Sequence, residues 1–347
     1  MKEKSNRLCN IEVLRVFAMY MIIVSHYLYH GIRLNPSLEL FNVSSFGEAL
    51  NYSVLQFISV FASTGVNCFV LITGYFLSTT HRFRANGFLN IWTETAFYTI
   101  VIGLLTSSLD FSAMGVLDML SPIPMTRYWF VGTYMLLLLV APLLARLCDH
   151  LSQRMHFGLL AILFLLFFDV IFHDKIASGM SLGWFIFLFL LGAYLRKYGV
   201  PDFVKRHALL IALGIGTALA LVHAGSNLMR YMSTGEDFTL KSTANNGLTF
   251  FLSLAIFVYF STRSFEGKVG RCLTRLAPCL FGVYLLHEYP DVRLMIWPEL
   301  VHGHNVWLCL IVSAAMLVAL AAVDWLRALL FRFTGLNKAI DWLTKRC

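Results

Sequence analysis

Apolar segments of about 20 residues follow one another along the whole chain, separated by short polar stretches. They fall at about residues 11–30, 55–78, 88–107, 128–145, 157–173, 181–195, 208–224, 245–261, 276–290 and 305–330. Each is long enough, or nearly so, to cross a hydrocarbon layer of about 30 Å as a helix. Helices are required because unpaired backbone groups in lipid cost several kcal/mol each. The pattern therefore predicts an all-α integral membrane protein with about ten transmembrane helices.

The composition supports this prediction. Of the 347 residues, 58% are hydrophobic and only 13% are charged, whereas about a quarter of the residues of a soluble domain are charged. The first apolar segment has no small-residue cleavage site and is followed by more apolar segments, so we expect a membrane span and not a secretory signal peptide. The longest predicted loop, about 31–54, is too short to fold alone. We expect residues 1–347 to form a single polytopic membrane domain.

The basic residues indicate the orientation. If the N-terminus is cytoplasmic and the spans alternate, most of the 27 Lys and Arg residues fall on the inner side. This is the bias that membrane insertion imposes, and it predicts that both termini are cytoplasmic. It also accounts for the net charge of +8 without a nucleic-acid partner, because the basic residues are spread over many segments. The expected partner is the bilayer of the plasma or inner membrane and its anionic headgroups.

The cysteines indicate neither disulfides nor a metal site. None of the seven lies in a predicted outer loop, so no disulfide framework is expected. No CxxC motif or Cys/His spacing suggests a bound metal.

The first predicted span carries ionisable side chains into the bilayer. Arg15 and His26 are eleven residues apart, which is within about 20° of three full turns, so both project from one helix face. Their separation along the axis is about 16 Å, which predicts Arg15 near the cytoplasmic end and His26 beyond the midplane. Glu12, three residues before Arg15, can pair with it. Arg15 could simply extend to the interface with Glu12, and residue types alone leave catalysis, transport and packing open for His26.

Other polar residues in the predicted spans carry weaker predictions. Glu94 could orient Arg15, line a cavity or form a structural pair. Asp324 and Arg327, at i and i+3, are expected to form a local ion pair. His287 should lie at a depth similar to that of His26, either in a shared outward-facing pocket or at the interface. The remaining histidines near predicted span ends are expected to be solvated: His30, His302 and His304.

The spacing Arg15-x10-His26, in a first span that opens IEVLR, resembles the acyltransferase 3 family of membrane O-acyltransferases. Three further segments resemble that family in the same order along the chain. They are STGVNCFVLITGYFLS at 63–78, RYWFVGTYMLLLLVAPLL at 127–144 and LAPCLFGVYLLHEYP at 276–290. Together they cover nearly the whole chain, and they are most similar to the branch that modifies surface polysaccharides.

The resemblance implies transfer of an acyl group, most often acetyl, from acetyl-CoA to a hydroxyl of a cell-surface polysaccharide or lipid-linked glycan. His26 would be the catalytic base and Arg15 its partner in the same pore. Acyl-CoA would be a donor substrate, and no bound cofactor is expected. The chain departs from the family at the arginine-rich run after the second span. Its loop THRFRANG contains only Arg82 and Arg84, which leaves another acyl group, such as succinyl, open.

These residues are compatible with the chemistry. A histidine that removes the proton of the acceptor hydroxyl allows direct attack on the thioester, without a covalent enzyme intermediate. Arg15, together with Arg82 and Arg84, could bind the CoA phosphates at the inner mouth of a pore. Three aromatic residues could line the sugar end or instead have girdle or packing roles: Tyr75, Trp129 and Tyr284.

Three rival functions share the membrane setting. A transporter or flippase for a lipid-linked glycan should show internal symmetry between two halves, and we see none. A glycan polymerase or ligase usually has a long outer loop, and the predicted outer loops are short. A membrane scaffold would leave Arg15 and His26 unexplained.

Overall fold

The computed structural model describes residues 2–35, 38, 41, 45–121, 127–167, 179–235, 238–240 and 247–344. All regular structure within these residues is helical, apart from one isolated bridge between Phe41 and Phe238. The prediction of an all-α protein is confirmed.

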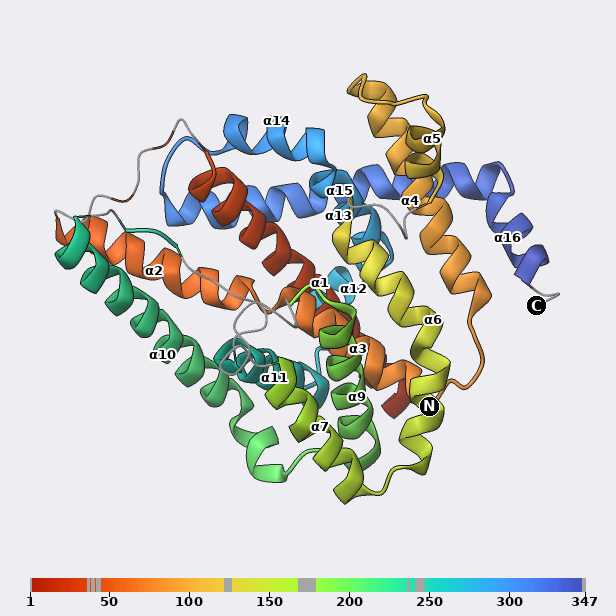
Figure 1. Cartoon of the computed structure of the whole chain (residues 1–347), viewed down its shortest axis with the longest axis horizontal. Helices are drawn as coiled ribbons and strands as arrows, with labels where there is room; N and C mark the ends of the chain where they lie inside the picture. Colours follow the sequence, from red (N-terminus) through yellow and green to blue (C-terminus); the bar gives the residue numbers. More distant parts are fainter. Residues whose placement is uncertain are drawn as a thin grey trace.

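The helices follow one another along the chain (Figure 1). They are α1 (Lys2–His26), η1 (Tyr27–Arg33), α2 (Phe46–Ala62), α3 (Gly65–Leu77), α4 (Ala85–Leu105), α5 (Ala113–Leu120), α6 (Trp129–His150), α7 (Gln153–Phe167), α9 (Leu182–Tyr198), α10 (Asp202–Thr234), α11 (Gly247–Thr262), α12 (Lys268–Thr274), η2 (Ala277–Cys279), α13 (Leu280–Glu288), α14 (Pro290–Leu300), α15 (Val306–Phe333) and α16 (Leu336–Thr344). The η1 segment is π-helical and η2 is a 3-10 turn.

Among the described residues, seven helical segments are long and apolar enough to span a membrane. They are Cys9–Arg33, Phe46–Leu77, Ala85–Leu105, Trp129–His150, Asp202–Thr234, Lys268–Glu288 and Val306–Phe333. The chain is therefore a multi-pass membrane protein. The other three predicted spans, at 157–173, 181–195 and 245–261, coincide with α7, α9 and α11, which have 15, 17 and 16 residues. Residues 168–173 and 245–246 lie outside the described residues, and the count of ten crossings stays a prediction.

The structure adds features that the apolar pattern did not predict. The segment predicted as one span at 55–78 is divided by a turn at Ser63 and Thr64 into α2 and α3. The hydroxyl groups of both residues donate hydrogen bonds to carbonyls three residues earlier, each at 2.7 Å. Such bonds offer the backbone an alternative to the helical ladder. The short helices α5, α14 and α16 were not predicted either.

Helix α1 lies at the centre of the bundle (Figure 1). It contacts α2, α3, α11, α12, α13 and α15. Leu14, Ile23 and Val24 on this helix are completely buried. A helix that is surrounded by protein in this way can carry ionisable side chains without exposing them to lipid.

Helices α3 and α9 pack with their backbones in contact. A Cβ atom at Gly74 would collide with the backbone of Phe189, and one at Gly192 would collide with the backbone around Leu71 and Tyr75. Only glycine permits this approach, because it has no Cβ. The contact fixes α3, which forms one wall of the cavities described below.

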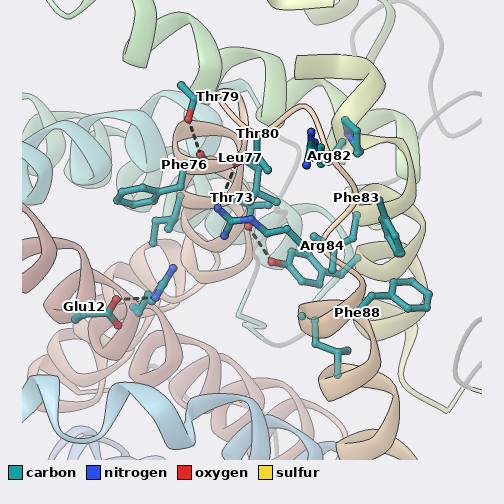
Figure 2. A pocket seen from close by; sticks show the side chains of 18 residues that line it. Glu12, Thr73, Phe76, Leu77, Thr79, Thr80, Arg82, Phe83, Arg84 and Phe88 are labelled. Atoms are coloured by element: carbon teal, nitrogen blue, oxygen red, sulfur yellow. Dashed lines mark hydrogen bonds and ion pairs between the residues drawn. The ribbon is translucent and has the colours of Figure 1, made fainter. Parts of the chain in front are cut away.

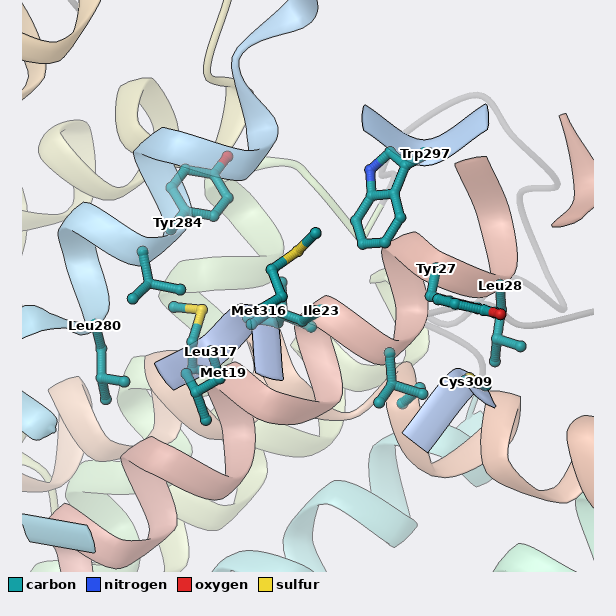
Figure 3. Packing of buried hydrophobic residues seen from close by; sticks show 14 of the residues in the cluster. Met19, Ile23, Tyr27, Leu28, Leu280, Tyr284, Trp297, Cys309, Met316 and Leu317 are labelled. Atoms are coloured by element: carbon teal, nitrogen blue, oxygen red, sulfur yellow. The ribbon is translucent and has the colours of Figure 1, made fainter. Parts of the chain in front are cut away.

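The packing of α13 against α1 positions the site. Figure 3 shows the buried side chains that join the two helices to α14 and α15: Met19, Ile23, Tyr27 and Leu28 from α1 and η1, Leu280 and Tyr284 from α13, Trp297 from α14, and Cys309, Met316 and Leu317 from α15. This apolar packing holds the C-terminal end of α13 beside the C-terminal end of α1.

Candidate active site

His26, the last residue of α1, meets two side chains from the end of α13. Its Nδ1 atom lies 3.0 Å from Nε2 of His287 and 3.2 Å from Oε2 of Glu288. The His287 and Glu288 side chains are almost fully buried, whereas the His26 side chain is 17% exposed. His287, which was predicted at a depth similar to that of His26, is therefore in direct contact with it, and a shared outward-facing pocket stays a prediction.

The hydrogen bonds assign the protons of the two imidazoles. Nδ1 of His287 lies 2.6 Å from the carbonyl oxygen of Val283, which can only accept, so this nitrogen carries a proton. In neutral His287, Nε2 is then an acceptor, and Nδ1 of His26 donates to it. Neutral His26 consequently keeps its lone pair on Nε2. The pairing leaves that nitrogen as the basic atom of the cluster.

Glu288 is oriented toward His26 by an arginine. Arg293, at the start of α14, donates from Nη1 to Oε1 of Glu288 at 2.8 Å. The other carboxylate oxygen, Oε2, accepts no hydrogen bond from the described residues and faces Nδ1 of His26. A buried carboxylate in this position stabilises positive charge on the imidazole when His26 takes up a proton, as in hydrolase triads.

Two adjoining cavities lie along the same face of α1. The deeper cavity, of about 270 Å³, is lined by Arg15, Met19 and Ile22 of α1. The wider cavity, of about 710 Å³, shares Arg15 with it, as well as Thr73 and Tyr134. Arg15, Met19, Ile22 and His26 fall on one helical stripe, which agrees with the predicted common face.

Cationic side chains surround the wider cavity. Arg15 donates to Glu12 at 2.6 Å, so the predicted local pair is confirmed. Arg82 and Arg84, in the loop between α3 and α4, line the same cavity, and Figure 2 shows Arg84 extending toward Thr80, to which it donates a hydrogen bond at 3.3 Å. The predicted donor-binding arginines therefore lie together.

A third cavity, of about 1070 Å³, adjoins the wider cavity and shares Arg82 and Arg84 with it. It is lined by Arg82, Arg84 and Arg146 and by Asp341 and Thr344 of α16. The C-terminal helix α16 thus lies beside the loop of Arg82 and Arg84, which lines the wider cavity together with Arg15. The side of the membrane on which each terminus lies stays a prediction.

Tyr284 separates the deeper cavity from the histidines. Its ring lines the cavity and lies 5.5 Å from the ring of Phe130 and 6.1 Å from that of His287. The Tyr284 hydroxyl has no hydrogen-bond partner among the described residues. Tyr284 therefore lies between the deeper cavity and the His26 cluster, and whether it contacts the sugar stays a prediction.

Glu94 lines the deeper cavity, but its ion pair is not with Arg15. Its Oε1 atom lies 3.1 Å from Nη2 of Arg327. Arg327 also binds Asp324 through two hydrogen bonds of 3.0 and 2.9 Å, so the predicted i and i+3 pair is confirmed. Of the roles predicted for Glu94, cavity lining and structural pairing agree with the structure.

Tyr75 and Trp129 lie away from His26. Gly65, at the start of α3, faces Ala18, and Tyr75 is ten residues further along α3 toward the Arg15 end. The Arg196 guanidinium lies 4.9 Å from its ring centre. Trp129 begins α6 but stacks edge-on against Phe185 of α9. The structure brings neither residue to the histidine pair.

The structure corrects one expectation about the remaining histidines. His30 is not simply solvated, because it is partly buried and its ring lies 5.5 Å from that of His26. His304 is also partly buried and stacks on Phe41, whereas His302 is exposed. Arg293 was not among the predicted site residues. The sequence feature that could have indicated its role is its position five residues after Glu288, which places it one turn into the next helix.

Comparison with known proteins gives one finding. The model of a family described as an acyltransferase domain, the acyltransferase 3 family, matches residues 10–325. No curated protein and no solved structure matches the chain.

Proposed function

We propose, on the premise that the chain belongs to the acyltransferase 3 family, that it transfers an acyl group from cytoplasmic acyl-CoA to a hydroxyl of a surface polysaccharide or lipid-linked glycan. The acyl group is acetyl in the simplest case, and His26 is the general base. The family supports acyl transfer to a hydroxyl. The donor, the acceptor and the role of His26 are our proposal.

The observation that carries the proposal is the contact of His26 with Glu288 and His287. His26 lies on the same helical stripe as Arg15, which lines both cavities. A packing histidine would need only a satisfied hydrogen bond. Here the neighbouring carboxylate leaves one oxygen directed at the imidazole, and Nε2 of His26 remains basic. This is the arrangement that general-base catalysis requires.

The reaction can be written with these residues. Nε2 of His26 removes the proton of the acceptor hydroxyl while the hydroxyl oxygen attacks the thioester carbonyl. The carbon–sulfur bond then breaks, the ester is released, and the proton on His26 passes to the departing CoA thiolate. The carboxylate of Glu288 stabilises the transient imidazolium, and His287 keeps the ring oriented.

The cavities suggest how the donor enters. The phosphates of acyl-CoA would bind near Arg15, Arg82 and Arg84, with Arg15 at the junction of the two cavities. The acyl chain would then extend along the Arg15, Met19 and Ile22 face of α1 toward Tyr284. Arginine is suited to this role because its planar guanidinium binds phosphate with two parallel hydrogen bonds. In this proposal the Arg15 end is cytoplasmic and the acceptor approaches from the His26 end.

The test is an assay of membrane vesicles with radiolabelled acetyl-CoA and a glycan acceptor. His26→Ala should abolish label transfer while expression and membrane insertion remain normal. The matched control is His302→Ala, which changes an exposed histidine and should leave transfer intact. Full activity of His26→Ala would refute the mechanism, and vesicles that translocate glycan without acylating it would favour the flippase.

A further inference from the structure

Three side chains around the proposed base have the chemistry of metal ligands. One ligand atom from each of His26, His30 and Glu288 lies within 4.8 Å of the other two. His26 and His30 are four residues apart at the junction of α1 and η1, and Glu288 comes from the end of α13. Sequence spacing did not indicate this group, because its third member is more than 250 residues away.

The group matches the donors that Zn²⁺ prefers. Two imidazoles four residues apart on one helix and one carboxylate from elsewhere form a common three-ligand zinc set, with a fourth position for water. Zinc bonds of about 2.0–2.2 Å place neighbouring ligand atoms about 3.3 Å apart. Nδ1 of His26 and Oε2 of Glu288 are already 3.2 Å apart. For Nδ1 to bind the metal, its proton moves to Nε2, its hydrogen bond to His287 is lost, and the His30 side chain moves closer.

The Glu288 carboxylate is held by a hydrogen bond from outside the ligand group, as the carboxylates of metal sites are. Oε2 of Glu288 accepts no hydrogen bond from the described residues, while Arg293 holds Oε1 at 2.8 Å. A ligating carboxylate fixed by a hydrogen bond on its other oxygen is the usual outer shell of such sites. The positive charge of Arg293 opposes a cation. Its side chain is 29% exposed and paired with the nearly buried Glu288, so solvent and the carboxylate offset much of this repulsion.

We infer that His26, His30 and Glu288 form an inhibitory binding site for a divalent transition metal of the Zn²⁺ type. The binding itself does not depend on the proposed function, whereas the inhibition does.

Inhibition follows because the His26 ring has only two nitrogens, and a bound metal occupies one of them. If the metal binds Nε2 of His26, the lone pair needed for proton removal is occupied. If it binds Nδ1, the ring proton moves to Nε2, which then cannot accept another. The imidazole loses its function as a base in either case. His30, in contrast, contributes only to metal binding.

Zinc binding can be measured directly on the purified full-length protein in detergent, after its thiols have been alkylated so that cysteine cannot bind the metal. ZnCl₂ titration should give one tight site. His30→Gln should weaken the affinity at least tenfold, because one ligand is lost, and His302→Gln should leave it unchanged. Mg²⁺ should not compete, since it prefers oxygen ligands.

The same variants test inhibition in the transfer assay. Zn²⁺ should inhibit the wild-type protein, a chelator should restore activity, and His30→Gln should retain basal activity with at least a tenfold higher inhibitory zinc concentration. Absence of a zinc site in the wild type, or equal zinc affinity in His30→Gln, would overturn the inference. A protein that binds zinc but shows no acyl transfer would count against the proposed function alone.

A second measurement is available if His30→Gln does not fold. Co²⁺ bound to the alkylated wild-type protein should give the strong visible absorption of a tetrahedral nitrogen and oxygen site. The weak spectrum of an octahedral ion would overturn the inference.

Discussion

Two buried ionic clusters contact helix α13 at different heights, and they differ in how many hydrogen bonds their central carboxylates, Asp324 and Glu288, accept. The first, which we call the structural cluster, consists of Asp324, Arg327, Glu94 and Tyr98. The second, the reactive cluster, consists of His26, His287, Glu288 and Arg293. A Cβ atom at Gly282 of α13 would collide with the Asp324 carboxylate, whereas His287, near the end of the same helix, touches His26.

In the structural cluster, both oxygens of the central Asp324 carboxylate accept hydrogen bonds. Asp324 is completely buried and accepts two hydrogen bonds from Arg327 and a third, of 2.8 Å, from the Tyr98 hydroxyl. A buried charge with this many donors is stabilised in one ionisation state and in one geometry. Such a group fixes helices relative to one another and has little capacity for proton transfer.

In the reactive cluster, one oxygen of the Glu288 carboxylate accepts no hydrogen bond from the described residues. Glu288 accepts one hydrogen bond, from Arg293, and its second oxygen faces an imidazole that can change its charge. Burial alone therefore does not distinguish a structural charge from a functional one. The distinction lies in whether the buried group has unused hydrogen-bonding capacity directed at a titratable partner.

The largest expected effect concerns Asp324. Asp324→Ala should lower the free energy of unfolding by about 3–5 kcal/mol, because it leaves the Arg327 charge buried without its closest partner. Thermal unfolding in detergent measures this, and Asp324→Asn should be less severe since it keeps an acceptor oxygen. A stable Asp324→Ala protein without transfer activity would move Asp324 from the structural to the reactive class.

The next largest effect concerns Glu288. Glu288→Gln keeps the size of the side chain but removes the charge that stabilises protonated His26, and should lower kcat about 100-fold, on the order of general-base effects. KM for the donor and the unfolding temperature should change little. Glu299→Gln, at an exposed position on α14, is the matched control. Normal kcat in Glu288→Gln would remove Glu288 from the mechanism.

A smaller effect is expected for the hydroxyl group of Tyr98. Tyr98→Phe removes the third donor of Asp324 and should reduce stability by about 1.5–3 kcal/mol, the usual range for a hydrogen bond to a charged group. The measurement is again thermal unfolding, compared with Tyr231→Phe, whose side chain is largely exposed. If both variants unfold at the wild-type temperature, the structural cluster contributes less than its geometry indicates.

The smallest effect is expected at the mouth of the wider cavity. Arg84→Ala should raise KM for acyl-CoA about fivefold with kcat retained, since an exposed arginine contributes roughly 1 kcal/mol to phosphate binding in water. The difference should shrink at high salt. Arg332→Ala, which removes an exposed arginine elsewhere, should have a normal KM. A drop in kcat alone would contradict a donor-binding role for Arg84.

Spacing along one helix was sufficient to predict part of this arrangement. The pairs Glu12–Arg15 and Asp324–Arg327 follow from separations of three residues on a helix. The common face of Arg15 and His26 follows from the helical repeat, and equal depth in the membrane led to the proximity of His26 and His287. These predictions need only the pitch of a helix and the thickness of a bilayer.

Contacts between helices could not be predicted in the same way. That Glu94 pairs with Arg327, or that Arg293 returns to Glu288 from the next helix, depends on how α4, α13, α14 and α15 rotate and pack. The division of 55–78 into α2 and α3 was also missed, because Ser63 and Thr64 are compatible with a continuous apolar segment until their hydroxyls bond to the backbone.

Because Tyr27–Arg33 is π-helical, the position of His30 relative to His26 depends on the number of residues in this segment as well as on their types. A π-helix contains more residues per turn than an α-helix, so it stores an extra residue relative to the α-helical register. Removing one residue between 27 and 29 would let the segment return to α-helical geometry and leave the residues after the segment close to their present orientation. His26 would keep its place at the end of α1, while His30 would move from four residues after it to three. A single deletion would thus change the neighbours of the base without changing the base.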